Sequence, residues 1–160
     1  MPNHDDRIYK LRNVFKNYNI DGLLVSKPEN IYYLSGFKGS TGYLFVTLYN
    51  AILVVDFRYE EQAKTQTEKN RTEVICAENL INVWLPEMTI ELQLRRLGLE
   101  SDYITVGFLE KIRDCLKIAK IATELVPLKD TVEQLRKIKY QEEITLITKA
   151  IELTEKTLSY

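Results

Sequence analysis

The chain has 160 residues, 45% of them hydrophobic and 28% charged, which fits one globular domain and the beginning of another. Its formal net charge is −1 and its acidic and basic residues are interspersed, which excludes nucleic acids and anionic membrane surfaces as partners recognised by charge. Its longest apolar runs are far shorter than the roughly 20 residues that cross a bilayer, so the sequence predicts no transmembrane helix.

The amino-terminal residues and the cysteines predict a cytoplasmic location. The first residues are polar and acidic, without the basic start and apolar run of a signal peptide. Cys76 and Cys115 fall in apolar stretches without a C-x-x-C spacing or a neighbouring histidine, so we expect two buried thiols in a reducing compartment. The single histidine, His4, lies in a terminus expected to be mobile and is not expected to be a catalytic base.

The first half of the chain predicts a helix and several short strands. Ile8, Leu11 and Phe15 recur at three- and four-residue spacings, which predicts a helix over residues 6–18 whose apolar side covers a sheet. Apolar, β-branched and aromatic runs predict strands at residues 22–26, 43–47 and 51–55, the last two forming an antiparallel hairpin.

Residues 28–35 predict a two-turn helix between the first two strands. Pro28 suits the first turn, where its missing N–H costs nothing, and Ile31 and Leu34 share one face. Gly36 can supply the left-handed residue that ends the helix.

The second half predicts a further alternation of helices and strands. Pro86 is expected to break a short turn or helix at residues 79–85, and Gly98 is expected to stop a helical stripe at residues 90–97. The remaining predictions are helices at residues 59–67 and 105–120 and strands at residues 73–77, 99–100 and 124–127. This alternation predicts the α/β class, with a mixed sheet of five or six strands flanked by helices.

The last residues predict one long amphipathic helix after a domain boundary. Residues 128–130 are the candidate boundary. Beyond it an apolar stripe continues to Tyr160, formed by Leu135, Ile138, Ile144, Ile147, Ile151 and Leu158. Such a stripe needs a partner, either the domain itself or a further one.

No catalytic motif is present in the sequence. The chain lacks H-E-x-x-H, G-x-S-x-G, a phosphate loop and a dinucleotide-binding glycine turn. Its carboxylates fall on helix faces and turns expected to be solvated, without a spacing that would bring several of them to one cation. We therefore expect neither a catalytic residue nor a metal ligand in this chain.

Two blocks of sequence together resemble a known family. Residues 28–37 read Pro-Glu-Asn-Ile-Tyr-Tyr-Leu-Ser-Gly-Phe and residues 56–59 read Asp-Phe-Arg-Tyr. Both are similar to the amino-terminal domain of the creatinase and proline-peptidase group, most closely an Xaa-Pro aminopeptidase or prolidase. Residues 135–144 are similar to the Leu-Arg-x-x-Lys-x-x-x-Glu-Ile pattern that opens the catalytic domain of that group. The resemblance implies a creatinase-type fold with ribonuclease H-like layering at residues 1–128, followed at residues 129–160 by a linker and the first helix of a truncated catalytic domain.

The loop at residues 38–42 is the most informative surface feature. From its residues alone it is a turn whose glycines take positive φ, and the longer spacing of a phosphate loop is absent. In the resembled family this loop reaches toward the active site of a neighbouring subunit. The resemblance therefore makes Phe37, Lys38, Ser40 and Thr41 candidates for lining a partner's substrate entrance. The short Gly-Ser-Thr-Gly form is similar to the Xaa-Pro aminopeptidase version and differs from that of creatinase.

The other motif residues are expected to be structural: Asn30, Tyr33, Gly36, Asp56, Arg58 and Tyr59. Asp56 can cap the following helix while Arg58 pairs locally. The amide of Asn30 can satisfy backbone groups of the nearby loop. Tyr32 and its neighbour Tyr33 cannot both face inward, so one is expected to meet solvent or a second subunit.

The resemblance implies a non-catalytic amino-terminal domain of an Xaa-Pro aminopeptidase-like metallopeptidase, serving oligomerisation and control of access to the active site. By this resemblance the complete enzyme would hold two divalent metal ions, with manganese as the expected metal, and would cleave the peptide bond before proline. Its partners would be its own catalytic domain, a second subunit and a peptide substrate. The alternatives are the corresponding domain of a prolidase, which cleaves Xaa-Pro dipeptides, and a stand-alone binding or assembly module without catalysis.

Overall fold

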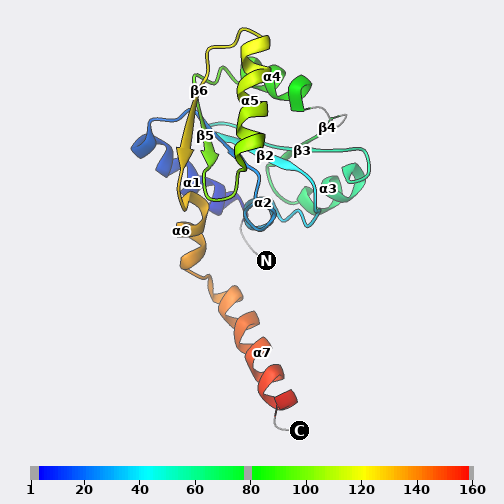
Figure 1. Ribbon diagram of the computed structural model, residues 1–160. Helices are drawn as coiled ribbons and strands as arrows, with labels where there is room; N and C mark the ends of the chain where they lie inside the picture. The colour runs from blue at the N-terminus through cyan, green and yellow to red at the C-terminus, as the bar shows by residue number, and fades with distance from the viewer. Residues whose placement is uncertain (1–3, 78–80, 159–160) are drawn as a thin grey trace.

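The computed structural model describes residues 4–77 and 81–158 and has the predicted α/β architecture (Figure 1). Helices and strands alternate along most of the chain. In order, the elements are α1 (His4–Tyr18), β1 (Gly22–Val25), α2 (Pro28–Ser35), β2 (Tyr43–Thr47), β3 (Ala51–Val55), α3 (Glu60–Thr67), β4 (Glu73–Cys76), α4 (Ile81–Glu91), β5 (Arg96–Glu100), α5 (Val106–Ile118), β6 (Glu124–Leu128), α6 (Thr131–Lys137) and α7 (Gln141–Leu158).

The described strands form one mixed sheet of six strands in the order β4-β3-β2-β1-β5-β6, which confirms the prediction of five or six. β2 pairs antiparallel with both β1 and β3, as expected for the hairpin. β4 is parallel to β3, β5 is parallel to β1, and β6 is parallel to β5. β2 therefore runs opposite to the other five strands, whose carboxyl ends all lie at one edge of the sheet.

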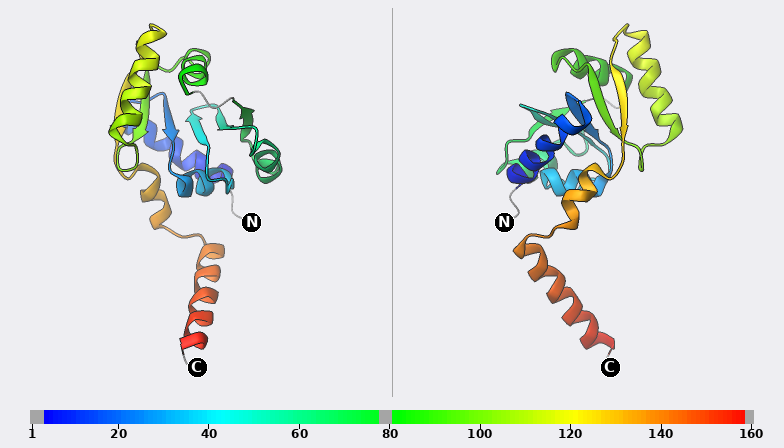
Figure 2. Two further views of the ribbon diagram at one scale, coloured as in Figure 1. Left: turned by 45° about the vertical axis from the view of Figure 1, so that its right-hand side comes forward. Right: turned by 90° about the vertical axis from the view of Figure 1, so that its left-hand side faces the viewer.

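Helices cover both faces of the sheet, each over its own hydrophobic core. One core combines the sheet with apolar side chains of α1, α2, α3 and α6, and the other combines it with those of α4 and α5. The right-hand view of Figure 2 shows α1 and α5 on opposite sides of the sheet. The first predicted helix thus does cover a sheet, through Ile8, Leu11 and Phe15, which are all buried.

Two expected helix breakers do not break helices. Pro86 lies in the middle of α4, where burial of Trp84, Leu85 and Met88 stabilises the helix against the lost hydrogen bond. Gly98 lies inside β5, opposite Leu23. A Cβ atom on Gly98 would come within 3.1 Å of three side chains, so glycine is needed there for space and does not stop a helix. Residues 79 and 80 of the predicted turn lie outside the described residues.

The single long helix predicted after residue 130 is two helices. Ile138 has an extended backbone (φ −93°, ψ 112°) and ends α6. α6 packs against α1 and α2 with Val132 fully buried, whereas α7 buries none of its described side chains. Figures 1 and 2 show α7 extending away from the sheet. Within the described ranges, no helix combines the length and apolarity needed to cross a membrane.

Candidate functional site

The two family-like motifs meet at the edge of the sheet where β1 and β3 end. We call this the carboxyl edge: residues 26–28, 36–42 and 56–59. Because Tyr43 of β2 pairs with Val54 of β3, the loop that precedes β2 lies beside the residues that follow β3. Segments some twenty residues apart in sequence are therefore neighbours in space.

The short helix α2 forms as predicted and leads into this loop. Gly36 takes the left-handed conformation (φ +83°) and its N–H donates to the carbonyl oxygen of Tyr32 over 2.8 Å. Tyr33 is 6% exposed and Tyr32 is 44% exposed, so one ring packs inward and the other meets solvent, as expected. The helix fixes where the loop begins.

Phe37 lies beneath the loop. Its side chain is 1% exposed, and its ring meets that of Tyr59 edge to face, with centroids 5.9 Å apart. Because it is buried in the core, Phe37 does not itself present a surface to a partner. The accessible candidates of the loop are Lys38, Ser40 and Thr41, all exposed.

Contacts from three other segments hold the loop in place. The backbone N–H of Lys38 donates to Oε1 of Gln66 over 2.8 Å, and its ammonium lies 5.4 Å from the centroid of the Tyr32 ring. The hydroxyls of Ser40 and Tyr59 are hydrogen-bonded at 2.7 Å. The loop is therefore an exposed but braced structure.

The glycines of the loop differ from the prediction that they take positive φ. Among the glycines of the described residues, only Gly36 does so. Gly39 is needed for space instead, because a Cβ atom there would lie 2.1 Å from the ring of Phe37.

Replacing Gly39 with alanine should therefore displace a buried ring and lower the free energy of unfolding by about 2 kcal/mol. Gly107 in α5 is the matched control, because nothing lies within 4 Å of a Cβ atom built there. Gly107→Ala should stabilise the protein by up to about 1 kcal/mol. Urea unfolding of both variants measures the difference, and equal stabilities would contradict the steric explanation.

Asp56 and Arg58 form a local ion pair, as expected. The guanidinium of Arg58 donates to both carboxylate oxygens of Asp56, over 3.0 and 2.7 Å, and its backbone N–H donates over 2.9 Å. These bonds hold the pKa of Asp56 below its usual value, although Asp56 is only 4% exposed and its desolvation acts to raise the pKa. Its carboxylate does not cap α3, since the N-cap residue is Tyr59, so the expected cap is corrected to a strand-to-helix turn.

Asn30 is the centre of a buried polar network that was not expected. Its side chain is fully buried, and Nδ2 donates to Glu100 over 2.6 Å and to Glu133 over 2.8 Å. Its Oδ1 accepts from Arg136 over 2.8 Å. The amide of Asn30 thus joins charged side chains of β5 and α6, and not the loop backbone groups that its position suggested.

Glu100 corrects the expectation that the carboxylates are solvated. It is 6% exposed and lies between the ends of β1 and β5, where its Oε2 accepts from the backbone N–H groups of Ser26 and Lys27 over 2.6 and 2.9 Å. Burial raises the pKa of Glu100, and the hydrogen bonds from Asn30 and the two backbone groups act against that rise. Glu100 thus serves as a fixed acceptor that shapes the loop before α2.

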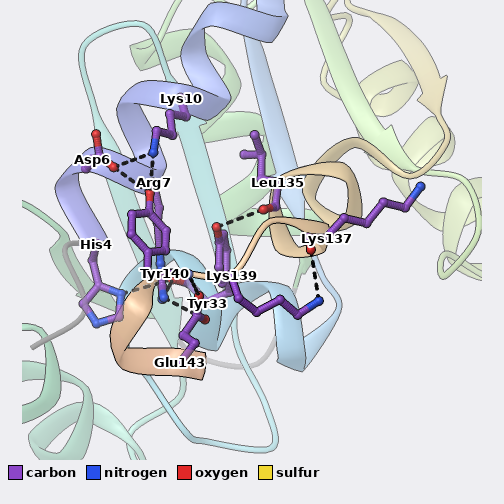
Figure 3. A network of polar contacts seen from close by, with 10 residues as sticks. All are labelled: His4, Asp6, Arg7, Lys10, Tyr33, Leu135, Lys137, Lys139, Tyr140 and Glu143. Carbon is purple, nitrogen blue, oxygen red and sulfur yellow. Dashed lines mark hydrogen bonds and ion pairs between the residues drawn. The ribbon is translucent and has the colours of Figure 1, made fainter. Parts of the chain in front are cut away.

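A second network joins α1 to the start of α7 (Figure 3). Its six residues are Asp6, Arg7, Lys10, Tyr33, Tyr140 and Glu143. Arg7 is 3% exposed and donates both to the carbonyl oxygen of Tyr33 and to Glu143. The sequence carries a signal for it, because Arg7 falls on the apolar stripe, four residues before Leu11. His4 also belongs to α1, with Nδ1 3.1 Å from the carbonyl oxygen of Tyr33, which corrects its expected place in a mobile end.

The part of the chain that the structure describes holds no group of three or more histidine, cysteine or acidic side chains arranged for a metal ion. Cys115 is buried as expected, but Cys76 is exposed, because β4 is an edge strand. Partial desolvation and the nearby Glu60 carboxylate raise the pKa of Cys76. Its environment therefore does not favour a reactive thiolate.

This fold and these motif positions agree with a comparison of the sequence with known families. The family described as Creatinase/Prolidase N-terminal domain matches residues 7–138. The chain belongs to this family. The match includes α6, whose Glu133 and Arg136 take part in the Asn30 network. It ends at Ile138, the residue that ends α6.

Relatives of this creatinase/prolidase N-terminal domain are peptidases and parts of peptidases. It is 33% identical to the uncharacterized peptidase YqhT of Bacillus subtilis over 149 residues, covering 93% of this chain and 40% of YqhT. The structure of Xaa-Pro dipeptidase from Bacillus anthracis is similar with a TM-score of 0.81 at 30% identity, over 89% of this chain and 38% of that one. The N-terminal domain of cytoplasmic peptidase PepQ from Mycobacterium tuberculosis H37Rv is similar with a TM-score of 0.73 at 35% identity, over 81% of this chain and 98% of that one. The chain thus spans about two fifths of its curated relative's length.

Proposed function

We propose that this creatinase/prolidase N-terminal domain is the non-catalytic amino-terminal part of an Xaa-Pro aminopeptidase-like metallopeptidase, which hydrolyses the peptide bond before proline. The observation that carries the proposal is the family match over residues 7–138 together with the 40% coverage of a peptidase. In this proposal the catalytic residues and two divalent metal ions, with manganese as the expected metal, belong to a second domain of the full-length protein.

The domain's own role would be oligomerisation and control of access to a neighbouring active site. The braced loop supports this role, because Lys38, Ser40 and Thr41 are exposed while Gln66 and Tyr59 limit how the loop can move. A fixed obstacle can exclude long or folded chains, whereas a mobile one would yield to them. Phe37 would contribute from below, by holding the loop's backbone.

The division between domains is proposed at residues 138–140, rather than at residue 128. Val132 of α6 is fully buried in this domain, while α7 has exposed apolar side chains that include Ile147 and Leu158. An apolar helix stripe without a covering surface is suited to pack against a further domain. A cytoplasmic location is also proposed, supported by the description of PepQ as a cytoplasmic peptidase.

Activity measurements on two lengths of the protein test the proposal. Residues 1–160 should show no cleavage of an Xaa-Pro peptide with added Mn²⁺, whereas the full-length protein should cleave it. In the full-length protein, Lys38→Ala combined with Thr41→Ala should change KM for peptides while leaving the fold intact. Lys16→Ala is the matched control, an exposed lysine of α1 away from the loop. Turnover by residues 1–160 alone would overturn the assignment.

A prolidase is the second candidate, favoured by the similarity to the Xaa-Pro dipeptidase from Bacillus anthracis. Substrate length separates the two, because a prolidase should act on Xaa-Pro dipeptides and an aminopeptidase on longer peptides. A full-length protein that cleaves neither would instead support a stand-alone binding or assembly module.

A further inference from the structure

The guanidinium of Arg7 is held between two tyrosine rings and two acceptors. Its central carbon lies 4.0 Å from the ring centroid of Tyr33 and 5.3 Å from that of Tyr140. It donates to the carbonyl oxygen of Tyr33 over 2.8 Å and to Oε1 of Glu143 over 2.9 Å. Two of these partners, Tyr140 and Glu143, belong to the segment that leaves the domain. A buried guanidinium needs a counter-charge, and Glu143 supplies it. The segment that begins at Tyr140, which we call the exit segment, is therefore attached to Arg7 of α1.

A second attachment is made by Asp6 and Lys10, which lie on either side of Arg7 in the sequence of α1. The hydroxyl of Tyr140 donates to Oδ2 of Asp6 over 2.6 Å and accepts from Nζ of Lys10 over 2.8 Å. The hydrogen bond from Tyr140 lowers the pKa of Asp6. Figure 3 shows the ring of Tyr140 directed toward α1, with Asp6 and Lys10 at its hydroxyl. The exit segment is thus held at two points, which restricts rotation as well as displacement.

Glu143 links this attachment to the formation of α7. Its Oε2 accepts from the backbone N–H of Tyr140 over 2.9 Å, as the glutamate of a capping box does, while its other oxygen binds Arg7. The first helical bond follows, from Ile144 N–H to the carbonyl oxygen of Tyr140 over 3.0 Å. Forming the first turn of a helix is unfavourable in free energy, because several residues are ordered for one hydrogen bond. In α7 no described side chain is buried to stabilise that turn. The beginning of α7 is therefore stabilised from α1.

We infer that Arg7 is a positioning residue that, with Tyr140 and Glu143, fixes the first turn of α7 on α1 and so sets the direction in which the chain leaves the domain. The inference about α7 stands on these contacts alone. Its consequence for activity rests on the proposed function, because this direction would set where the loop at residues 38–42 meets a following domain.

Hydrogen exchange of the 160-residue protein tests the inference. Glu143→Gln keeps a side chain that can cap Tyr140 but removes the charge that pairs with Arg7. We expect the amides of residues 144–148 to exchange about tenfold faster, while the amides of residues 22–25 in the central strand β1 stay protected. Arg7→Met should speed the exchange of these amides at least as much. Arg7→Lys should also leave them less protected than in the unchanged protein, because an ammonium lacks the planar fork that reaches both the Tyr33 carbonyl oxygen and Glu143.

Arg12→Met is the matched control. Arg12 lies on the same helix and donates to a carbonyl oxygen, that of Thr47, over 2.7 Å, but it does not contact the exit segment. It should leave exchange at residues 144–148 unchanged. Because Glu143 is on α7, outside both cores, Glu143→Gln keeps the test decisive even where Arg7→Met unfolds the domain. Unchanged exchange in Glu143→Gln, or purely additive effects in the double variant with Arg7→Met, would overturn the inference.

Discussion

Replacing Asn30 with alanine is expected to lower the free energy of unfolding by roughly 3 to 5 kcal/mol. The change removes the donors to Glu100 and Glu133 and the acceptor of Arg136. Asn30 is fully buried and Glu100 is buried, while Glu133 and Arg136 are partly buried. Charged groups that lose a buried partner keep their desolvation cost without its compensation. Since a domain of this size is stable by only about 5 to 15 kcal/mol, urea unfolding should show the loss clearly.

Two further variants separate this network from a general effect of losing an asparagine. Asn17 lies exposed on α1, and Asn17→Ala should change stability by less than about 0.5 kcal/mol. Asn30→Asp can still accept from Arg136 but places a third carboxylate beside Glu100 and Glu133, so it should destabilise at least as much as alanine at neutral pH. If Asn30→Asp were as stable as the wild type, the donor role of the Asn30 amide would be refuted.

Local signals predicted the elements around the carboxyl edge well. Pro28 and Gly36 each act within one or two turns of the chain, and α2 begins and ends at the positions they indicated. The runs at residues 43–47 and 51–55 have the bounds of β2 and β3 as predicted, because their partners are each other. Where a signal and its structural partner are close in sequence, the prediction holds.

Partners that are distant in sequence account for what the sequence could not show. Asn30 meets Glu100 and Glu133 across 70 and 103 residues, and no spacing pattern connects such positions. Pro86 and Gly98 were read from local propensity, but tertiary packing decided both of their conformations. The break between α6 and α7 likewise lies beside Tyr140, whose hydroxyl meets Asp6 of α1 across 134 residues.

Phe37→Ala is expected to cost roughly 3 to 5 kcal/mol, the largest effect of any single change in the loop region. The ring is 1% exposed, fills the space next to Gly39 beneath the loop and meets Tyr59 edge to face. Its removal leaves a cavity and also frees the loop from its support, so the hydrogen bond between Ser40 and Tyr59 should weaken. Urea unfolding measures the first effect, and faster amide exchange at residues 38–42 measures the second.

Phe57→Ala is the matched control, since this phenylalanine lies only one residue before Arg58 but is 73% exposed. It should change stability by less than about 0.5 kcal/mol. Under the proposed peptidase function, the same two variants of the full-length protein test whether Phe37 supports the loop or contacts a substrate. Phe37→Ala should alter peptide selectivity only together with amide exchange in the loop, because its ring is buried in the core. A Phe37→Ala protein with wild-type stability and loop exchange but altered selectivity would show instead that Phe37 contacts the substrate directly.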